Sequence, residues 1–108
     1  MIPPIDLSLE DWHEVLHILQ KHVPHLQVWA FGSRARRTAK PYSDLDLALI
    51  TQTPLLLEER AMLADAFDES TLPIRVDLVD WATTSENFRK IITQDKVMIQ
   101  QSIKKEDP

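Results

Sequence analysis

Two short motifs near the middle of the chain constrain its fold more than any other feature. Gly32-Ser33 contains the only glycine and follows an apolar segment, and Asp44-Leu45-Asp46 begins the next apolar segment after ten intervening residues. A lone glycine at such a place favours a sharp turn or a close approach of the backbone to a ligand. If both motifs serve one site, the end of the first strand and the start of the second lie at the same edge of the sheet. These two neighbouring strands are therefore predicted to run antiparallel.

The spacing of apolar side chains predicts an α-β-α-β-α-β-α order of elements. Strands are predicted at residues 26–31, 45–51 and 74–79. Helices are predicted to begin near Ser8, Ser33, Thr53-Pro54 and Thr83. Residues 96–100 fit either a short strand or a last helical turn. With an antiparallel first strand pair, this order predicts an α+β fold in which a small mixed sheet is packed by helices, and not a doubly wound parallel sheet.

Three of the predicted helices carry apolar side chains at helical spacing, which indicates the face that packs on the sheet. The first has Trp12, Val15, Leu16 and Leu19, the third has Leu55, Met62, Leu63, Ala66 and Phe67, and the last has Phe88, Ile91 and Ile92.

Length and composition predict one domain over residues 1–108, with a frayed polar tail from about residue 103. The chain has no apolar run of the roughly 20 residues that a membrane span needs, and its N-terminus does not resemble a signal peptide. It has no cysteine, which excludes disulfides, thiol catalysis and cysteine-ligated zinc. A cytoplasmic location without a membrane partner is therefore expected.

The net charge of −5 argues against non-specific binding to nucleic acid, which relies on a broad basic surface. Four basic residues nevertheless lie within seven positions beside the glycine-serine turn: Arg34, Arg36, Arg37 and Lys40. In an acidic chain such a cluster favours a small anion over a polyanion, although solvated surface charge explains many clusters of this kind.

The carboxylates of Asp44 and Asp46 suit a divalent metal. Residues two apart on a strand project to the same face, so both side chains can reach the same ions. Mg²⁺ prefers oxygen ligands, usually one or two carboxylates together with substrate phosphates and water. Asp77, on the third predicted strand, can complete a three-carboxylate site for two ions if that strand lies beside the second. Nucleotidyl transfer needs such an arrangement.

Ser33 and the start of the short helix after it suit the phosphates of a nucleotide. Free backbone N–H groups and the positive end of the helix dipole attract an anion, and the serine hydroxyl can add a hydrogen bond. Arg34 or Arg36 can reach the same phosphates. Helical spacing sends these two side chains in different directions, so at least one is expected to be structural.

Each of these motifs has a plainer explanation when it is taken alone. Asp-x-Asp is common at the start of a strand, where it usually reflects exposure to solvent. Asp80 is a rival to Asp77 for the third carboxylate, but it lies three positions after Asp77, an odd spacing, and falls at the end of the strand. The combination of a strand, Gly-Ser, a short basic helix, Asp-x-Asp and a later isolated aspartate favours a nucleotide and metal site.

This combination resembles the minimal nucleotidyltransferases of the DNA polymerase β superfamily over essentially the whole chain. The residues that match the family pattern are Gly32, Ser33, Asp44, Asp46 and Asp77, and Arg34 and Ala35 match its usual continuation. The resemblance implies that Asp44, Asp46 and Asp77 are catalytic and bind two Mg²⁺ ions, and that ATP is bound at Gly32, Ser33 and Arg34. It also implies an antitoxin paired with a HEPN-domain ribonuclease toxin, which some members silence by transferring AMP from ATP to a tyrosine.

Arg37 departs from the family pattern, which often has glycine four residues after the serine. Glycine there would end the short helix easily in the left-handed conformation. Arginine either costs energy at this position or lets the helix run further, whereas the metal ligands are unaffected.

The segment His13-Glu14-Val15-Leu16-His17 satisfies the H-E-x-x-H zinc-protease pattern on a predicted helix. The longer metzincin pattern fails, because Gln20 and Val23 occupy the positions of its glycine and third histidine. Both histidines flank the apolar stripe on its polar side, which favours exposed side chains on an amphipathic helix.

Two functions of different classes remain open, and a third, a small metalloprotease, would require bound zinc. A domain of this size has no extra lobe to hold tRNA or DNA, so the acceptor must dock from outside. The leading hypothesis is a Mg²⁺-dependent transfer of AMP from ATP to a protein side chain of the toxin. The alternative is a binding module that neutralises its partner by complex formation alone.

Overall fold

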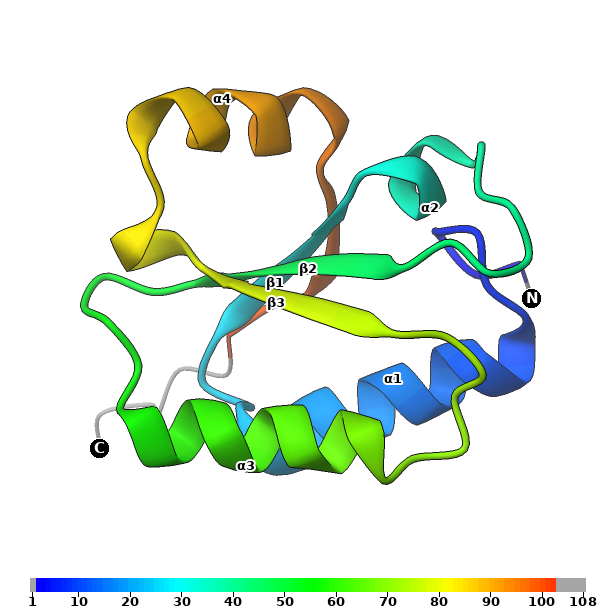
Figure 1. Ribbon diagram of the computed structural model, residues 1–108, viewed down its shortest axis with the longest axis horizontal. Helices are drawn as coiled ribbons and strands as arrows, with labels where there is room; N and C mark the ends of the chain where they lie inside the picture. The colour runs from blue at the N-terminus through cyan, green and yellow to red at the C-terminus, as the bar shows by residue number, and fades with distance from the viewer. Residues whose placement is uncertain (1, 103–108) are drawn as a thin grey trace, which may run out of the picture.

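The computed structural model describes residues 2–102, and its elements follow the predicted order with a fourth strand added (Figure 1). The order is α1 (Leu9–His22), β1 (Gln27–Phe31), α2 (Ser33–Arg36), β2 (Leu45–Ile50), α3 (Leu57–Asp68), β3 (Val76–Asp80), α4 (Glu86–Asp95) and β4 (Val97–Gln100). A 3₁₀ turn, η1 (Trp81–Thr83), joins β3 to α4. Residues 96–100, for which the sequence allowed either a short strand or a last helical turn, contain strand β4. The frayed tail predicted from residue 103 lies outside the described residues.

The strands of the described chain form a mixed sheet in the order β3-β2-β1-β4. β1 is antiparallel to β2 and to β4, and β2 is parallel to β3. The predicted antiparallel first pair and the α+β fold with a small mixed sheet are therefore confirmed. In this register Asp46 is the partner of Phe31 on one side and of Asp77 on the other.

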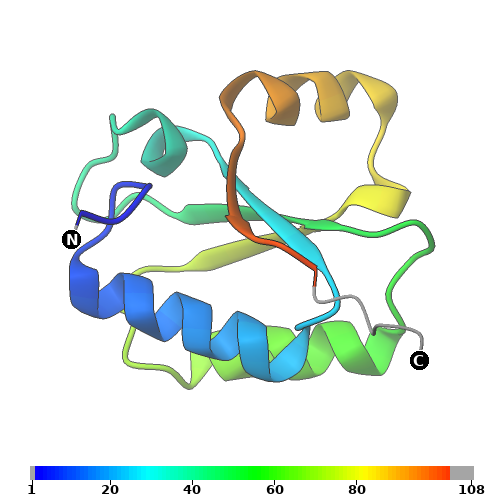
Figure 2. The same cartoon turned by 180° about the vertical axis from the view of Figure 1, so that it is seen from behind.

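Helices cover both faces of the sheet. α1 and α3 lie together across one face, and α2 and α4 lie on the opposite face (Figures 1 and 2). Strand β2 contributes three fully buried leucines to the main core, beneath α1 and α3: Leu45, Leu47 and Leu49. A smaller core on the other face contains Phe31, Ala48 and Ile92. Because successive side chains of a strand alternate between faces, Asp46 points to this second face.

α1 begins and ends as predicted. The hydroxyl of Ser8 accepts a hydrogen bond from the backbone N–H of Asp11 (3.1 Å) and caps the helix. The helix ends at His22, two residues before Pro24. None of the helices in residues 2–102 has the length and apolar character that crossing a bilayer requires.

α3 begins at Leu57, not at Thr53-Pro54 as predicted. The carboxylate of Asp80, at the end of β3, accepts hydrogen bonds from the Leu55 backbone N–H (2.8 Å) and from the Thr51 hydroxyl. These bonds hold the segment after β2 against the end of β3, so the helix starts only beyond it.

The predicted buried faces of α3 and α4 are partly wrong. Leu55 precedes α3, and Met62 is exposed. On α4 only Ile92 of the three predicted residues is buried, while Ile91 is 53% exposed and Phe88 is also exposed. A short helix that contacts a sheet along one line through Ile92 leaves its flanking side chains near solvent. The face of α3 that packs on the core consists of Leu63, Ala66 and Phe67.

The cap of α4 is Ser85, not Thr83. The Ser85 hydroxyl accepts a hydrogen bond from the backbone N–H of Phe88 (3.2 Å). Thr83 belongs to η1, where its hydroxyl donates to the carbonyl of Asp80 (3.1 Å). Strand β3, predicted at residues 74–79, begins two residues later, at Val76, and ends one residue later, at Asp80.

Candidate active site

Gly32 adopts a backbone conformation that only glycine accepts readily. Its φ of 75° and ψ of −158° lie in a region that other residues avoid. A β-carbon at this position would lie 2.5 Å from Oδ2 of Asp46, well inside van der Waals contact. Glycine is therefore needed at this position for two reasons: it allows the turn between β1 and α2, and it lets the side chain of Asp46 approach that turn closely.

Three carboxylates gather beside this turn. Asp46 and Asp77 are direct partners in the parallel β2–β3 pair, and Asp44 lies two residues before Asp46. Burial raises the pKa of the Asp46 carboxyl, and the negative charges of Asp77 and Asp44 raise it further, while Arg36 acts in the opposite direction. The structure thus brings the three predicted acidic residues within electrostatic reach of one another.

These carboxylates fit a divalent cation by charge and by chemistry. All are hard oxygen donors, as Mg²⁺ requires, and a cation would relieve the repulsion that raises the pKa of Asp46. Asp77 pairs with Arg75, whose Nε lies 3.2 Å from Oδ1 of Asp77. Within residues 2–102 no three acidic or histidine side chains already form a metal-binding group. A cation shared by all three aspartates would therefore draw their oxygens closer together, and it would compete with Arg75 for Asp77.

The rival carboxylate, Asp80, is occupied by structural hydrogen bonds. It is buried, and it accepts from the backbone N–H groups of Leu55 (2.8 Å) and Ala82 (3.2 Å) and from the hydroxyl of Thr51. A carboxylate that already has three donors is poorly placed to bind a metal. The geometry supports Asp77 as the third acidic residue of the site.

Arg34 is not placed to bind nucleotide phosphates with its side chain, contrary to the prediction. The residue is only 6% exposed. Its guanidinium donates to the backbone carbonyls of Asp6 (2.7 Å), Ser43 (2.8 and 3.0 Å), Pro41 (3.3 Å) and Lys40 (3.4 Å). These bonds join α2 to the N-terminal segment and to the loop before β2. Arg34 therefore stabilises the loop that carries Asp44.

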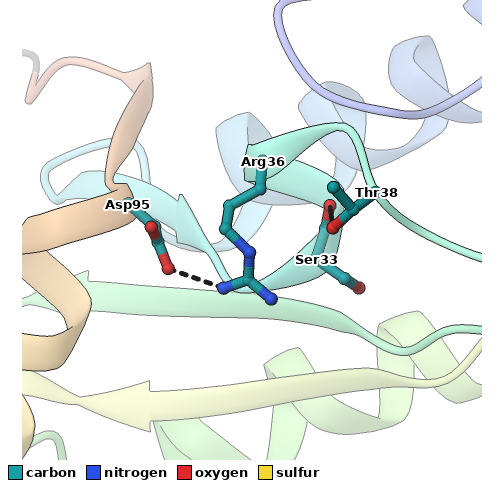
Figure 3. Close-up of polar contacts among 4 residues, drawn as sticks. All are labelled: Ser33, Arg36, Thr38 and Asp95. Atoms are coloured by element: carbon teal, nitrogen blue, oxygen red, sulfur yellow. Dashed lines mark hydrogen bonds and ion pairs between the residues drawn. The ribbon is translucent and has the colours of Figure 1, made fainter.

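Two further arginines of the basic cluster also have partners within the protein. Nη1 of Arg36 lies 2.7 Å from Oδ2 of Asp95, at the end of α4, and Arg37 donates to the carbonyl of Pro3. Arg34 and Arg37 therefore act within the fold, which confirms that at least one arginine beside Ser33 is structural, whereas the side chain of Arg36 is half exposed. Arg36 is the member that acts on Asp46. Figure 3 shows Arg36 and Ser33 extending from α2 toward the strands beneath it.

The short helix α2 ends at Arg36, and Arg37 follows in the left-handed conformation with φ 61° and ψ 36°. This strain costs a residue other than glycine about 1 kcal/mol. We therefore expect the Arg37→Gly variant to be more stable than Arg37→Ala by about 1 kcal/mol, since both lose the bond to Pro3 and only alanine keeps the strain. Urea unfolding of the two variants measures the difference, and equal stability would contradict the prediction.

His13 and His17 lie exposed on α1, as predicted. α1 covers the face of the sheet opposite α2 and α4, so both histidines are remote from the three aspartates (Figure 1). They form no part of the candidate site.

Sequence reasoning missed two residues beside the site, Arg75 and Asp95. Arg75 precedes Asp77 by two positions and lies just before β3, so alternation along this extended segment was a signal that could have found it. Asp95 lies 59 residues from Arg36, and no sequence pattern links them.

A family model described as polymerase beta, nucleotidyltransferase matches residues 13–104, which include both motifs and Asp77. The chain belongs to this family. Among its relatives, a protein of Haemophilus influenzae named probable protein adenylyltransferase MntA is 54% identical over 100 residues, which cover 93% of this chain and 88% of that protein. The resemblance to nucleotidyltransferases seen in the sequence is thereby confirmed.

Solved structures share the fold of this nucleotidyltransferase. A toxin–antitoxin crystal structure with AMP-PNP has a chain that matches with a TM-score of 0.71 and 25% identity, over 85% of this chain and 74% of that one. The complex of a tri-AMPylated Shewanella oneidensis HEPN toxin with its MNT antitoxin matches with a TM-score of 0.67 and 22% identity, over 89% and 74%. The second likeness, at its lower identity, bears on the fold alone.

Proposed function

We propose that this nucleotidyltransferase is a Mg²⁺-dependent protein adenylyltransferase, which transfers AMP from ATP to a tyrosine of a HEPN-domain ribonuclease toxin and so acts as its antitoxin. The 54% identity to a protein named as an adenylyltransferase supports the activity. The likeness to a toxin–antitoxin structure with AMP-PNP supports a nucleotide substrate and a toxin partner. The single observation that carries the proposal is the register of Asp46 opposite Asp77, against the Gly32 turn.

Each residue of the site has a role in this reaction. The turn at Gly32 and Ser33 offers backbone N–H groups and a hydroxyl to the triphosphate, and Arg36 adds a positive charge beside it. The residues that would hold the cations are Asp44, Asp46 and Asp77. Bound Mg²⁺ would neutralise phosphate charge and favour the ionised acceptor hydroxyl. The tyrosine oxygen then bonds to the α-phosphorus, pyrophosphate leaves, and the phenolic proton passes to a carboxylate or to water.

The acceptor can reach this site from outside the domain. Asp77 lies on β3, which is an edge strand of the sheet in residues 2–102, and Arg75 lies just before this strand. Their side chains are 39% and 75% exposed. A docked protein can therefore present a side chain to the carboxylates without any opening of the fold. The cytoplasmic location expected from the sequence stays a prediction.

Inhibition by complex formation alone is the alternative. Labelling separates the two functions: the purified protein is mixed with the HEPN-domain protein encoded beside it and with ATP labelled on the α-phosphate. We expect label on the partner when Mg²⁺ is present and none when EDTA removes the metal. A partner that stays unlabelled while its ribonuclease activity is fully inhibited would overturn the catalytic proposal and favour complex formation.

A further inference from the structure

We infer that Asp95 is a positioning residue that holds Arg36 in place for the triphosphate and away from the three metal-binding carboxylates. The inference rests on the proposed function, because it assigns a role within the same site. It concerns a residue on α4, an element that contributes none of the predicted catalytic groups.

The geometry of the pair carries this role. Nη1 of Arg36 lies 2.7 Å from Oδ2 of Asp95, and the dashed contact in Figure 3 spans from α2 to the end of α4. In the same view the rest of the guanidinium lies between Asp95 and Ser33, toward the strands. One edge of Arg36 is thus tied to α4, and its other N–H groups remain available on the side of the phosphate-binding turn.

Asp95 is not the only negative charge near Arg36, because the three carboxylates of the candidate site also attract its guanidinium. Arg36 lies close enough to Asp46 to affect its carboxyl, and Asp46 lies with Asp44 and Asp77 in a group of three negative charges. A guanidinium released from Asp95 would be drawn onto these carboxylates, where it would oppose the binding of a divalent cation. The ion pair with Asp95 keeps Arg36 beside the acidic group without placing it on the metal ligands.

The fold itself has little need of the pair. The side chains of Arg36 and Asp95 are 49% and 23% exposed, and ion pairs with such exposure contribute about 0–1 kcal/mol to stability. A carboxylate at the last position of a helix is also slightly unfavourable, because it meets the negative end of the helix dipole. The pair is therefore better explained by the site than by stability.

The test is the Asp95→Asn variant, with Asp68→Asn as its matched control. Asp68 is likewise the last residue of its helix, α3, and it lies exposed on the far side of the sheet. Calorimetric titration with Mg²⁺ and a non-hydrolysable ATP analogue is expected to show affinity about 10- to 100-fold weaker for Asp95→Asn, by analogy with the removal of a residue that orients a metal ligand. Asp68→Asn should bind as the wild type does, and thermal unfolding should change little in either variant.

Kinetics and a charge swap complete the test. In AMP transfer, Asp95→Asn should raise KM for ATP and leave kcat nearly unchanged. The double variant Arg36→Glu, Asp95→Arg rebuilds an ion pair between α2 and α4 but puts a negative charge beside the phosphates. Recovery of ATP affinity in this double variant would show that the pair acts only by joining the helices, and wild-type affinity in Asp95→Asn would overturn the inference as well. If the wild type binds the analogue but transfers no AMP, the proposed function fails while the binding test of Asp95 still stands.

Discussion

Replacing Asp46 with asparagine is expected to abolish AMP transfer and to make the metal-free protein more stable. Asparagine keeps the shape of the side chain beside Gly32 but removes the negative charge that would bind the cation. The loss of one electrostatic contact to a transition state typically costs about 10²- to 10³-fold in rate, and loss of a metal ligand should cost at least that. Like charges directly opposite each other on adjacent strands are destabilising, so relief of the repulsion with Asp77 should raise the free energy of unfolding by roughly 0.2–1 kcal/mol, the size of other cross-strand pair effects.

The transfer of labelled AMP and urea unfolding in EDTA measure the two effects. Asp80→Asn provides the contrast, because this buried carboxylate accepts three hydrogen bonds and takes no part in the proposed chemistry. It should lose about 1–3 kcal/mol of stability and keep its activity per folded molecule. Normal transfer by Asp46→Asn would remove the proposed role of this residue.

The destabilising effect of the Asp46 charge should also appear in the pH dependence of stability. The pKa of Asp46 is raised in the folded protein, so the folded state holds this proton more tightly than the unfolded state does. As pH rises from the unfolded pKa through the folded one, Asp46 therefore lowers the free energy of unfolding, and above both values the penalty is constant. Metal-free wild type should show this decline relative to Asp46→Asn in urea unfolding at a series of pH values. Parallel stability curves for the two proteins would contradict it.

Replacing Arg34 with methionine is expected to cause a large loss of stability, about 3 kcal/mol or more. Methionine fills part of the space but leaves the partly buried carbonyls of Asp6 and Ser43 without their donor, and an unsatisfied buried group costs about 1–3 kcal/mol. Arg75→Met is the matched control, since the Arg75 side chain is 75% exposed, and it should change stability by less than about 0.5 kcal/mol. Urea unfolding compares the two, and a loss below about 1 kcal/mol for Arg34→Met would contradict the structural role.

Much of the fold and of the site could be predicted because both depend on local patterns. Short apolar runs and alternation identified three of the four strands in the described residues, and β4 stayed undecided. A turn at Gly32 with carboxylates at Asp44 and Asp46 required two strand ends at one edge of the sheet. That requirement led directly to the antiparallel pair and to the placement of Asp77, provided that β3 lay beside β2, as it does.

The errors arose where distant or backbone partners decide the structure. The start of α3 depends on Asp80, which reaches back 25 residues to the N–H of Leu55. The role of Arg34 depends on backbone carbonyls, which every sequence offers and which no side-chain pattern reveals. The assignment of Arg34 to a phosphate followed from its place after Ser33, and burial overrides such adjacency.

The parallel pairing of β2 with β3 makes the acidic site sensitive to a shift of a single residue. Side chains on a strand reverse direction at every step, so displacement of β3 by one position would turn Asp77 into the apolar layer beneath the sheet and present Val76 or Leu78 in its place. Insertions in the connection before β3 can be absorbed by the loop, whereas an insertion within the strand cannot. Evolution of this chain can therefore lengthen the connection between α3 and β3 outside its core contacts at Leu72 and Ile74, but the five positions of β3 must change by substitution alone.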